Sequence, residues 1–183
     1  YAAVAGVGAT IIATFAGYAI ATMRFPGRNA LLAVTLAFMS IPSTVITVPL
    51  FLMYSKIGLV GTPWAVIIPQ LATPFGLYLM IIYAQTSIPV SLIEAAKLDG
   101  ASTWTIFWKV GFPLLSPGFV TVLLFTLVGV WNNYFLPLIM LSDTNDYPLT
   151  VGLNMWLKMG AQGTANGQVP NNLIITGSLI AVV

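Results

Sequence analysis

Charged residues are rare along the chain and divide it into long apolar segments. Five stretches carry no charge at all: residues 1–23, 29–55, 57–93, 110–142 and 159–183. A helix needs about 20 apolar residues to cross the hydrocarbon core of a bilayer. The pattern therefore predicts four complete membrane-spanning helices, at 1–23, 29–55, about 64–85 and about 119–141, and the start of another at 173–183.

The composition agrees with a membrane protein. Hydrophobic residues make up 58% of the 183 residues and charged residues only 5%, whereas a soluble domain carries about 25% charged residues. The bilayer core tolerates only helices or closed barrels, and the alternating pattern of barrel strands is absent from this sequence. We therefore predict an all-α fold, a polytopic bundle of transmembrane helices.

The residue types exclude several kinds of catalytic site. The chain has no cysteine and no histidine, which removes disulfides, thiol nucleophiles, Ser-His-Asp triads and the common zinc sites. None of its lysines follows a glycine, so it lacks the phosphate-binding G-x-x-x-x-G-K-[ST] loop. We expect no enzyme activity, no catalytic or metal site and no cofactor in this chain. The net charge of +2 is too small to indicate nucleic acid binding.

The first span carries small residues on one broad face. They are Gly6, Thr10, Thr14 and Thr22 in one row, and Ala5, Ala9, Ala13, Gly17 and Ala21 in a second. Small side chains let helix backbones approach closely. The face predicts either ordinary helix packing or a specific dimer contact.

The second and third spans are interrupted by proline and polar residues. The interruptions are Ser40–Thr44 and Pro49 in the second span, and Pro69-Gln70 and Thr73–Gly76 in the third. A proline removes one backbone hydrogen bond and disfavours a straight helix. These sites are either simple kinks or bends that line a pathway, in which case Gln70 faces the interior.

The fourth span contains two consecutive amides, Asn132 and Asn133, in an apolar run. Amides in lipid are costly unless they are hydrogen-bonded. They lie either at the membrane interface, beside aromatic anchors, or in contact with other helices or a polar solute. Gln70, Asn132 and Asn133 are therefore the candidate residues of a translocation pathway.

Basic residues indicate the orientation of the chain. Four of them, Arg24, Arg28, Lys97 and Lys109, fall on one side of the predicted spans, and two, Lys56 and Lys158, on the other. Cytoplasmic loops carry an excess of Lys and Arg. The bias places residues 23–29 and 85–118 in the cytoplasm.

The longer cytoplasmic loop contains residues that favour the starts and ends of two short helices. Pro89 suits the first turn of a helix, and Gly100 suits a left-handed stop at its end. Ser102 can cap a second helix. Pro113 marks the end of that helix or its approach to the membrane. The sequence predicts a helix, a glycine turn and a second helix.

The same loop carries a spaced motif. Glu94-Ala95-Ala96 is followed after three residues by Gly100, and after nine more by Val110-Gly111-Phe112-Pro113. This resembles the EAA loop of ABC importer permeases, whose pattern is EAA, three residues, Gly, nine residues and Ile-x-Leu-Pro. Val110 and Phe112 depart from Ile and Leu but remain apolar. The resemblance implies that residues 86–117 couple the chain to ATPase subunits, through Glu94, Ala95, Ala96, Asp99, Gly100 and Pro113.

The resemblance extends over nearly the whole chain. The segments 24–28, 41–42, 49–50, 74–76 and 131–133 are similar to the carbohydrate-uptake branch of the permeases, the MalG-like subunits. The likeness implies a MetI-like permease fold with six spans. Residues 1–183 are then expected to be a fragment of one permease transmembrane domain, without the first span and with a truncated last span.

The resemblance also implies a mechanism and its partners. A second permease subunit completes a heterodimer, two separate ATP-binding cassette subunits bind ATP and Mg²⁺, and an extracytoplasmic binding protein delivers a sugar or oligosaccharide. The multi-pass subunit is expected in the cell (inner) membrane of a bacterium or archaeon. The external loop, about 142–172, is expected to meet the binding protein and to include a surface helix at Leu149–Met159 with Trp156 as its anchor.

One other class of transporter remains open from the residues alone. A secondary carrier driven by an ion gradient often uses membrane-buried acids or histidines. No complete predicted span contains a charged residue or a histidine, which argues against proton coupling. Sodium carriers can use backbone carbonyls instead, so this alternative is not excluded by composition.

Overall fold

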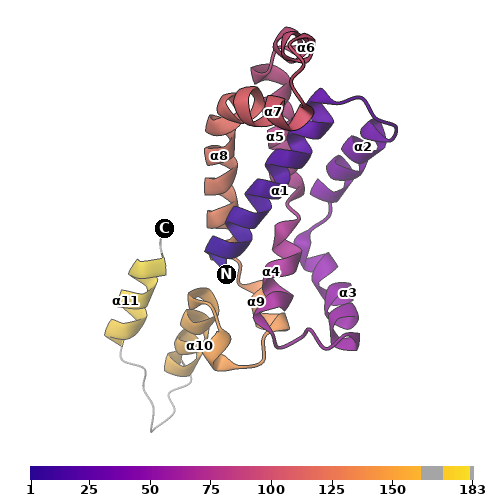
Figure 1. Cartoon of the computed structure of the whole chain (residues 1–183). Coiled ribbons are helices and arrows are strands. Elements are labelled where there is room, and N and C mark those ends of the chain that lie inside the picture. The colour runs from indigo at the N-terminus through magenta and orange to yellow at the C-terminus, as the bar shows by residue number, and fades with distance from the viewer. Residues whose placement is uncertain (162–170, 182–183) are drawn as a thin grey trace. The chain divides into compact units, whose positions relative to one another are not determined.

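The computed structural model describes residues 1–161 and 171–181, and these form helices and connecting turns without strands. Figure 1 shows the helices in order along the chain. The α-helices are α1 (Ala2–Thr22), α2 (Arg28–Met39), α3 (Ser43–Lys56), α4 (Pro63–Leu71), α5 (Pro74–Ser87), α6 (Val90–Leu98), α7 (Thr103–Ile106), α8 (Phe112–Trp131), α9 (Phe135–Met140), α10 (Leu149–Ala161) and α11 (Asn171–Ala181). A π-helix, η1 (Phe107–Gly111), joins α7 to α8, and a 3-10 helix, η2 (Thr144–Asp146), follows α9.

Among the described residues, three helical segments are long and apolar enough to cross a membrane. They are Ala2–Thr22, Pro63–Ser87 and Thr103–Trp131. The broken pair of α2 and α3 makes a fourth if it counts as one span. The predicted spans at 1–23, 29–55 and about 64–85 therefore correspond to observed helices. The all-α prediction is confirmed for the residues that the structure describes.

The chain divides into two compact units. The first, here the α1 unit, contains Ala2–Pro42 and Gln70–Leu127. The second, here the α3 unit, contains Tyr1, Ser43–Pro69 and Val128–Val183. Each has its own cluster of buried apolar side chains.

The α1 unit is built on the small-residue face of α1, which packs along α5. A Cβ placed on Gly17 would lie 2.6 Å from the Cβ of Met80, so only glycine permits this approach. Thr10 and Thr126 share a hydrogen bond of 2.9 Å between their hydroxyl oxygens, joining α1 to α8. The small face is thus used for packing within the chain, the first of the two interpretations.

The predicted interruptions at residues 40–44 and 73–76 are confirmed. Helix α2 ends before Pro42 and α3 begins after it, because a residue that precedes proline avoids the helical region. Helix α5 begins at Pro74, and the hydroxyl oxygen of its N-cap Thr73 accepts a hydrogen bond of 3.2 Å from the backbone N–H of Gly76. These local signals are strong enough to set the helix ends.

Two other proline sites, predicted as kinks or bends, do not separate helices. Pro49 lies inside α3 and Pro69 inside α4. A proline removes a single hydrogen bond from the ladder, and apolar membrane helices tolerate this loss because nearby groups compensate for the freed carbonyl. Neither proline ends its helix, and a kink or a pathway-lining bend at these two residues stays a prediction.

The fourth predicted span, at about 119–141, also needs correction. The helix begins earlier, since α8 starts at Phe112 and continues without a break from η1, and it ends at Trp131. Residues 132–134 separate it from α9. The side-chain oxygen of Asn133 accepts a hydrogen bond of 3.3 Å from the N–H of Leu136, which starts the next helix instead of extending α8.

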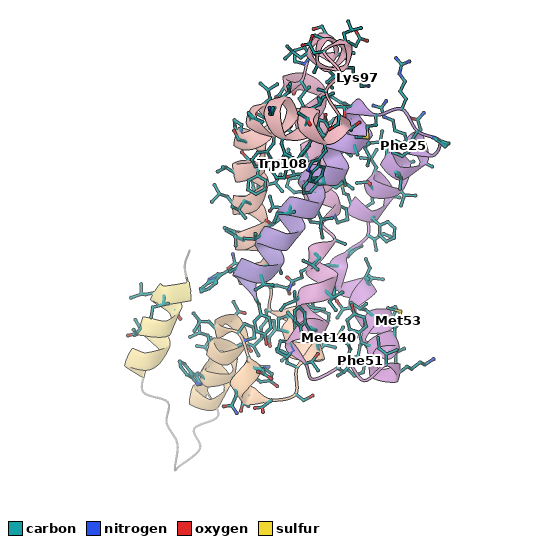
Figure 2. The ribbon with its side chains drawn as sticks, in the orientation of Figure 1. Phe25, Phe51, Met53, Lys97, Trp108 and Met140 are labelled. Carbon is teal, nitrogen blue, oxygen red and sulfur yellow. The ribbon has the colours of Figure 1, made fainter. Side chains whose placement is uncertain are left out.

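The α3 unit surrounds a smaller apolar cluster. Met140 is fully buried there with Phe51 packed beside it, whereas Met53 on the same helix as Phe51 is 55% exposed (Figure 2). The N–H of Gly61 donates to the carbonyl of Met140 at 2.8 Å. The helix predicted at Leu149–Met159 is present as α10, with Trp156 37% exposed, and its position on the membrane surface stays a prediction. Residues 162–170 of the predicted external loop lie outside the described residues.

Candidate functional site

The predicted helix–glycine–helix loop is present at one end of the α1 unit, where α6 and α7 follow α5 (Figure 1). Gly100 has a φ of 78°. The N–H of Gly100 donates to the carbonyl of Lys97 at 3.0 Å, and the N–H of Ala101 donates to the carbonyl of Ala96 at 3.0 Å. These two bonds form a Schellman motif, in which the residue after the helix adopts a left-handed conformation. The predicted role of Gly100 as a helix stop is confirmed.

The requirement for glycine at position 100 is a matter of backbone conformation alone. A Cβ built on Gly100 meets no atom within 4 Å. Residues with a Cβ are sterically disfavoured in the left-handed region. Substitution here strains the turn without creating a collision.

Helix α6 is mostly exposed and is held by a narrow strip of apolar side chains. Ile93 is its only buried residue, and Ile88 just before it is also buried. Ala96 packs partly buried against the same cluster. Leu98 is 89% exposed, and Lys97 extends from the outer side of the helix (Figure 2).

The EAA tripeptide is therefore divided between two faces of α6. Ala96 faces the unit's own core and supplies a carbonyl to the Gly100 turn. Glu94 and Ala95 are exposed, as is Asp99 at the helix end. Glu94 forms no ion pair with Lys97 or with any other residue that the structure describes. An exposed, unpaired carboxylate beside a small side chain is suited to contact with a separate protein.

The second loop helix begins at the predicted cap. The hydroxyl oxygen of Ser102 accepts a hydrogen bond of 3.2 Å from the N–H of Thr105. Helix α7 then passes through η1 into α8 as one continuous helical segment. Pro113 lies exposed in the first turn of α8, so the alternative in which it ends the second helix was wrong.

A cluster of rings fixes α7 and η1 to α1. We call it the aromatic clamp, and its members are Phe15, Tyr18, Trp104, Phe107, Trp108, Phe112 and Phe119. Phe107 is 3% exposed and its ring centroid lies 4.7 Å from that of Phe15 and 5.0 Å from that of Tyr18. A Cβ on Gly111 would lie 2.7 Å from Cε2 of Tyr18. The clamp is the physical connection between the loop and α1.

The sequence interpretation did not assign a role to the clamp. Its signal was present, since aromatic residues occupy positions 104, 107, 108 and 112, a spacing that places them on one helical face. The partners on α1, Phe15 and Tyr18, lie about 90 residues away in the chain, and no local pattern connects them.

Comparison with known proteins identifies the family. Residues 9–183 match the family described as "Binding-protein-dependent transport system inner membrane component". The chain belongs to this family. Its MetI-like fold and inner-membrane location follow from that membership, which favours the importer over the ion-driven carrier.

Named relatives of this permease family are similar over most of the chain. The arabinooligosaccharides transport system permease protein AraQ of Halalkalibacterium halodurans is 32% identical over 143 residues, which are 78% of this chain and 51% of the relative. The protein LplC of Bacillus subtilis is 32% identical over 172 residues, 93% of this chain and 57% of the relative. The trehalose transport system permease protein SugB of Mycobacterium tuberculosis is 29% identical over 177 residues, 96% of this chain and 62% of the relative.

A solved structure of an ABC transporter is also similar to this chain. It is a crystal structure of a bacterial ABC transporter involved in the import of the acidic polysaccharide alginate, with a TM-score of 0.79 and 27% identity, covering 99% of this chain and 65% of that chain. The permease chain described here spans about half the length of the first two relatives above.

The three predicted pathway residues occupy different settings. Gln70 is half-buried near the end of α4. The side-chain oxygen of Asn133 bonds to the first turn of α9, and its backbone carbonyl accepts a hydrogen bond of 3.3 Å from the hydroxyl of Thr150. Asn132 is exposed, and its N–H completes the last turn of α8 by donating to Val128 at 3.0 Å. A structural role accounts for Asn133, and the pathway role of all three stays a prediction.

Proposed function

We propose that this chain is part of a permease subunit of an ATP-driven importer of sugars or oligosaccharides. It forms half of the translocation pathway, with a second permease subunit as the other half. Residues 86–117 couple it to two separate ATPase subunits. The observation that carries this proposal is the exposed Glu94–Ala95 face of α6, on a helix whose apolar contacts with the unit include Ile88, Ile93 and Ala96.

The exposed face has the chemistry of a docking helix. Val90 and Leu98 are 67% and 89% exposed, and apolar side chains on a helix are stabilised when a partner groove covers them. Ala95 is small enough to let α6 enter such a groove. Glu94 then pairs with a basic residue of the ATPase, and Gly100 lets the chain turn sharply toward α7.

The coupling step follows from the clamp. ATP-driven closure of the ATPase subunits moves α6 and α7, and the aromatic clamp transmits this movement to α1. Rigid rocking of helices about a central site is the expected form of such a transition. ATP and Mg²⁺ are bound by the partner subunits, and this chain supplies no ATPase site.

Sugar as the solute is supported by the relatives. The names of AraQ and SugB specify arabinooligosaccharides and trehalose, and the solved transporter imports alginate. An extracytoplasmic binding protein delivers the sugar in this proposal. Among the pathway candidates Asn132 is the best supported, because its exposed amide makes no side-chain hydrogen bond with described residues and is costly in lipid.

The test is substrate-stimulated ATPase activity of the complete transporter in proteoliposomes. The full-length permease, its partner permease, the ATPase subunits and the binding protein are assembled and presented with oligosaccharides, monosaccharides and amino acids. We expect stimulation by one class of saccharide only. Stimulation by an amino acid alone refutes the sugar assignment, and uptake that needs an ion gradient but no ATP refutes the importer.

A further inference from the structure

An open pocket lies in the α1 unit where the chain passes from α1 to α2. It is lined by Arg24, Phe25, Gly27, Arg28, Asn29 and Ala30. Figure 2 labels Phe25, one of the residues that line the pocket. The pocket lies at the same end of α1 as α6 and α7. The coupling mechanism uses none of these residues.

The first turn of α2 presents unused hydrogen-bond donors to this pocket. Its N-cap is Gly27, with a φ of 90° and no side chain to accept a hydrogen bond, and no acidic residue lies in the first turn. The N–H groups of Asn29 and Ala30 have no acceptor among the described residues. The positive end of a helix with free N–H groups attracts an anion.

Two guanidinium groups add positive charge and further donors. Nη2 of Arg28 donates to the carbonyl of Ala21 at 3.4 Å, which holds the side chain against the end of α1. Its Nε is buried and has no hydrogen-bond partner among the described residues, although buried donors are nearly always satisfied in proteins. Arg24 is exposed, and neither arginine pairs with a carboxylate in the described part of the chain.

The surface that continues from the pocket along α2 is apolar. Thr35 is the only buried residue of α2. Leu31, Val34 and Phe38 are 47%, 51% and 49% exposed, and their spacing places them along one side of the helix. A ligand with an anionic head and hydrocarbon tails matches both the basic pocket and the apolar side of α2. A free anion matches only the pocket.

We propose that this pocket binds the phosphate group of an anionic phospholipid. The phosphate oxygens accept hydrogen bonds from the Arg24 and Arg28 guanidinium groups and from the first-turn N–H groups of α2. The acyl chains lie along Leu31, Val34 and Phe38. Arginine forks and helix N-termini are both suited to phosphate, and basic pockets at helix ends recognise anionic headgroups. Binding does not depend on which solute the transporter carries.

The test counts phospholipids retained by the complete transporter in detergent, by native mass spectrometry, as phosphatidylglycerol is added. We expect one retained lipid to be lost first in Arg24→Gln and in Arg28→Lys, with apparent affinity lowered about tenfold. Arg28→Lys keeps the charge but cannot form the fork. The matched control is Lys56→Gln, an exposed basic residue at the end of α3, which should retain the lipid as wild type does.

Two further measurements distinguish binding of a lipid phosphate from binding of free phosphate. Phosphatidylcholine should not replace phosphatidylglycerol, and 10 mM inorganic phosphate should not displace it. Equal retention of the two lipids, or an unchanged affinity in Arg24→Gln, overturns the proposal. Displacement by inorganic phosphate overturns the lipid assignment in favour of a free anion. Arg24→Gln decides the outcome if Arg28→Lys fails to assemble, because Arg24 is exposed and bonds to no described residue.

Discussion

The ring of Phe107 meets the ring of Tyr18 edge to face, with 5.0 Å between their centroids and 72° between their planes. Phe107 lies in the π-helical segment that follows the Glu94 loop, and Tyr18 lies near the end of α1. Both rings are buried. The helical segment that follows the exposed helix α6 is therefore joined to α1 by a closely packed aromatic core.

Gly111→Ala should loosen this core. The new Cβ would lie 2.7 Å from Cε2 of Tyr18, so the ring must move, at a cost of about 1–3 kcal/mol. We expect a lower unfolding temperature and weaker sugar stimulation of the ATPase. Gly129→Ala is the matched control, because a Cβ there meets nothing within 4 Å. Pairing Gly111→Ala with Tyr18→Leu should restore part of the loss, and no rescue would argue against the contact.

Gly100→Val should strain the loop turn. Its φ of 78° is unfavourable for a β-branched residue, with a cost of about 1 kcal/mol or more. Gly100→Asn should be milder because asparagine tolerates the left-handed region. The measurement is the amount of ATPase subunit that co-purifies with the permease. Normal co-purification and transport by Gly100→Val would refute the role of this turn in docking.

Glu94→Ala should separate a docking contact from a solvated charge. Glu94 is exposed and unpaired among the described residues, so the free energy of unfolding should change little. Loss of a partner cation in a dry groove costs about 2–5 kcal/mol, so ATPase co-purification and sugar uptake should fall. Asp143→Ala, an exposed carboxylate in the external loop, serves as the control for ATPase co-purification. Wild-type uptake in Glu94→Ala would remove this residue from the coupling contact.

Thr126→Val should weaken the contact between α1 and α8. Thr126 and Thr10 share a hydrogen bond of 2.9 Å, and such bonds in membrane proteins contribute about 0.6 kcal/mol on average. Thr121→Val is the control, since the hydroxyl of Thr121 is exposed and bonds only to Pro117 in its own helix. A thermal unfolding assay in detergent should show a larger shift for Thr126→Val. Equal shifts would mean that the interhelical bond adds no stability.

Single cysteines should report the topology, because the chain has none of its own. Leu98→Cys lies at the exposed end of α6, and Thr144→Cys lies in the exposed turn after α9. The excess of basic residues places position 98 in the cytoplasm. A membrane-impermeant thiol reagent applied to cells expressing the full-length permease should label Thr144→Cys only. Labelling of both positions from outside would contradict the proposed orientation.

The sequence by itself determined the helical class, the coupling-loop turn and several helix ends. The apolar composition places much of the chain in lipid. Backbone groups in lipid must form hydrogen bonds within the chain, and helices satisfy this requirement. The turn at Gly100 and the caps at Thr73 and Ser102 depend on a few neighbouring residues, whose backbone preferences act locally. The motif of Glu94-Ala95-Ala96 and Gly100 was visible for the same reason, since its spacing lies within one short loop, and its docking role stays a proposal.

The tertiary structure determined which helix faces pack together and which hydrogen bonds the polar residues form. The sequence could not tell whether the side chain of Asn133 faces a solute or bonds to a neighbouring helix turn, and only the position of Leu136 shows the bond. It also did not show that Pro113 continues a helix, because that continuity depends on the π-helical segment held against Tyr18 by Phe107. Contacts between residues about 90 positions apart are set by packing, for which a local pattern has no signal.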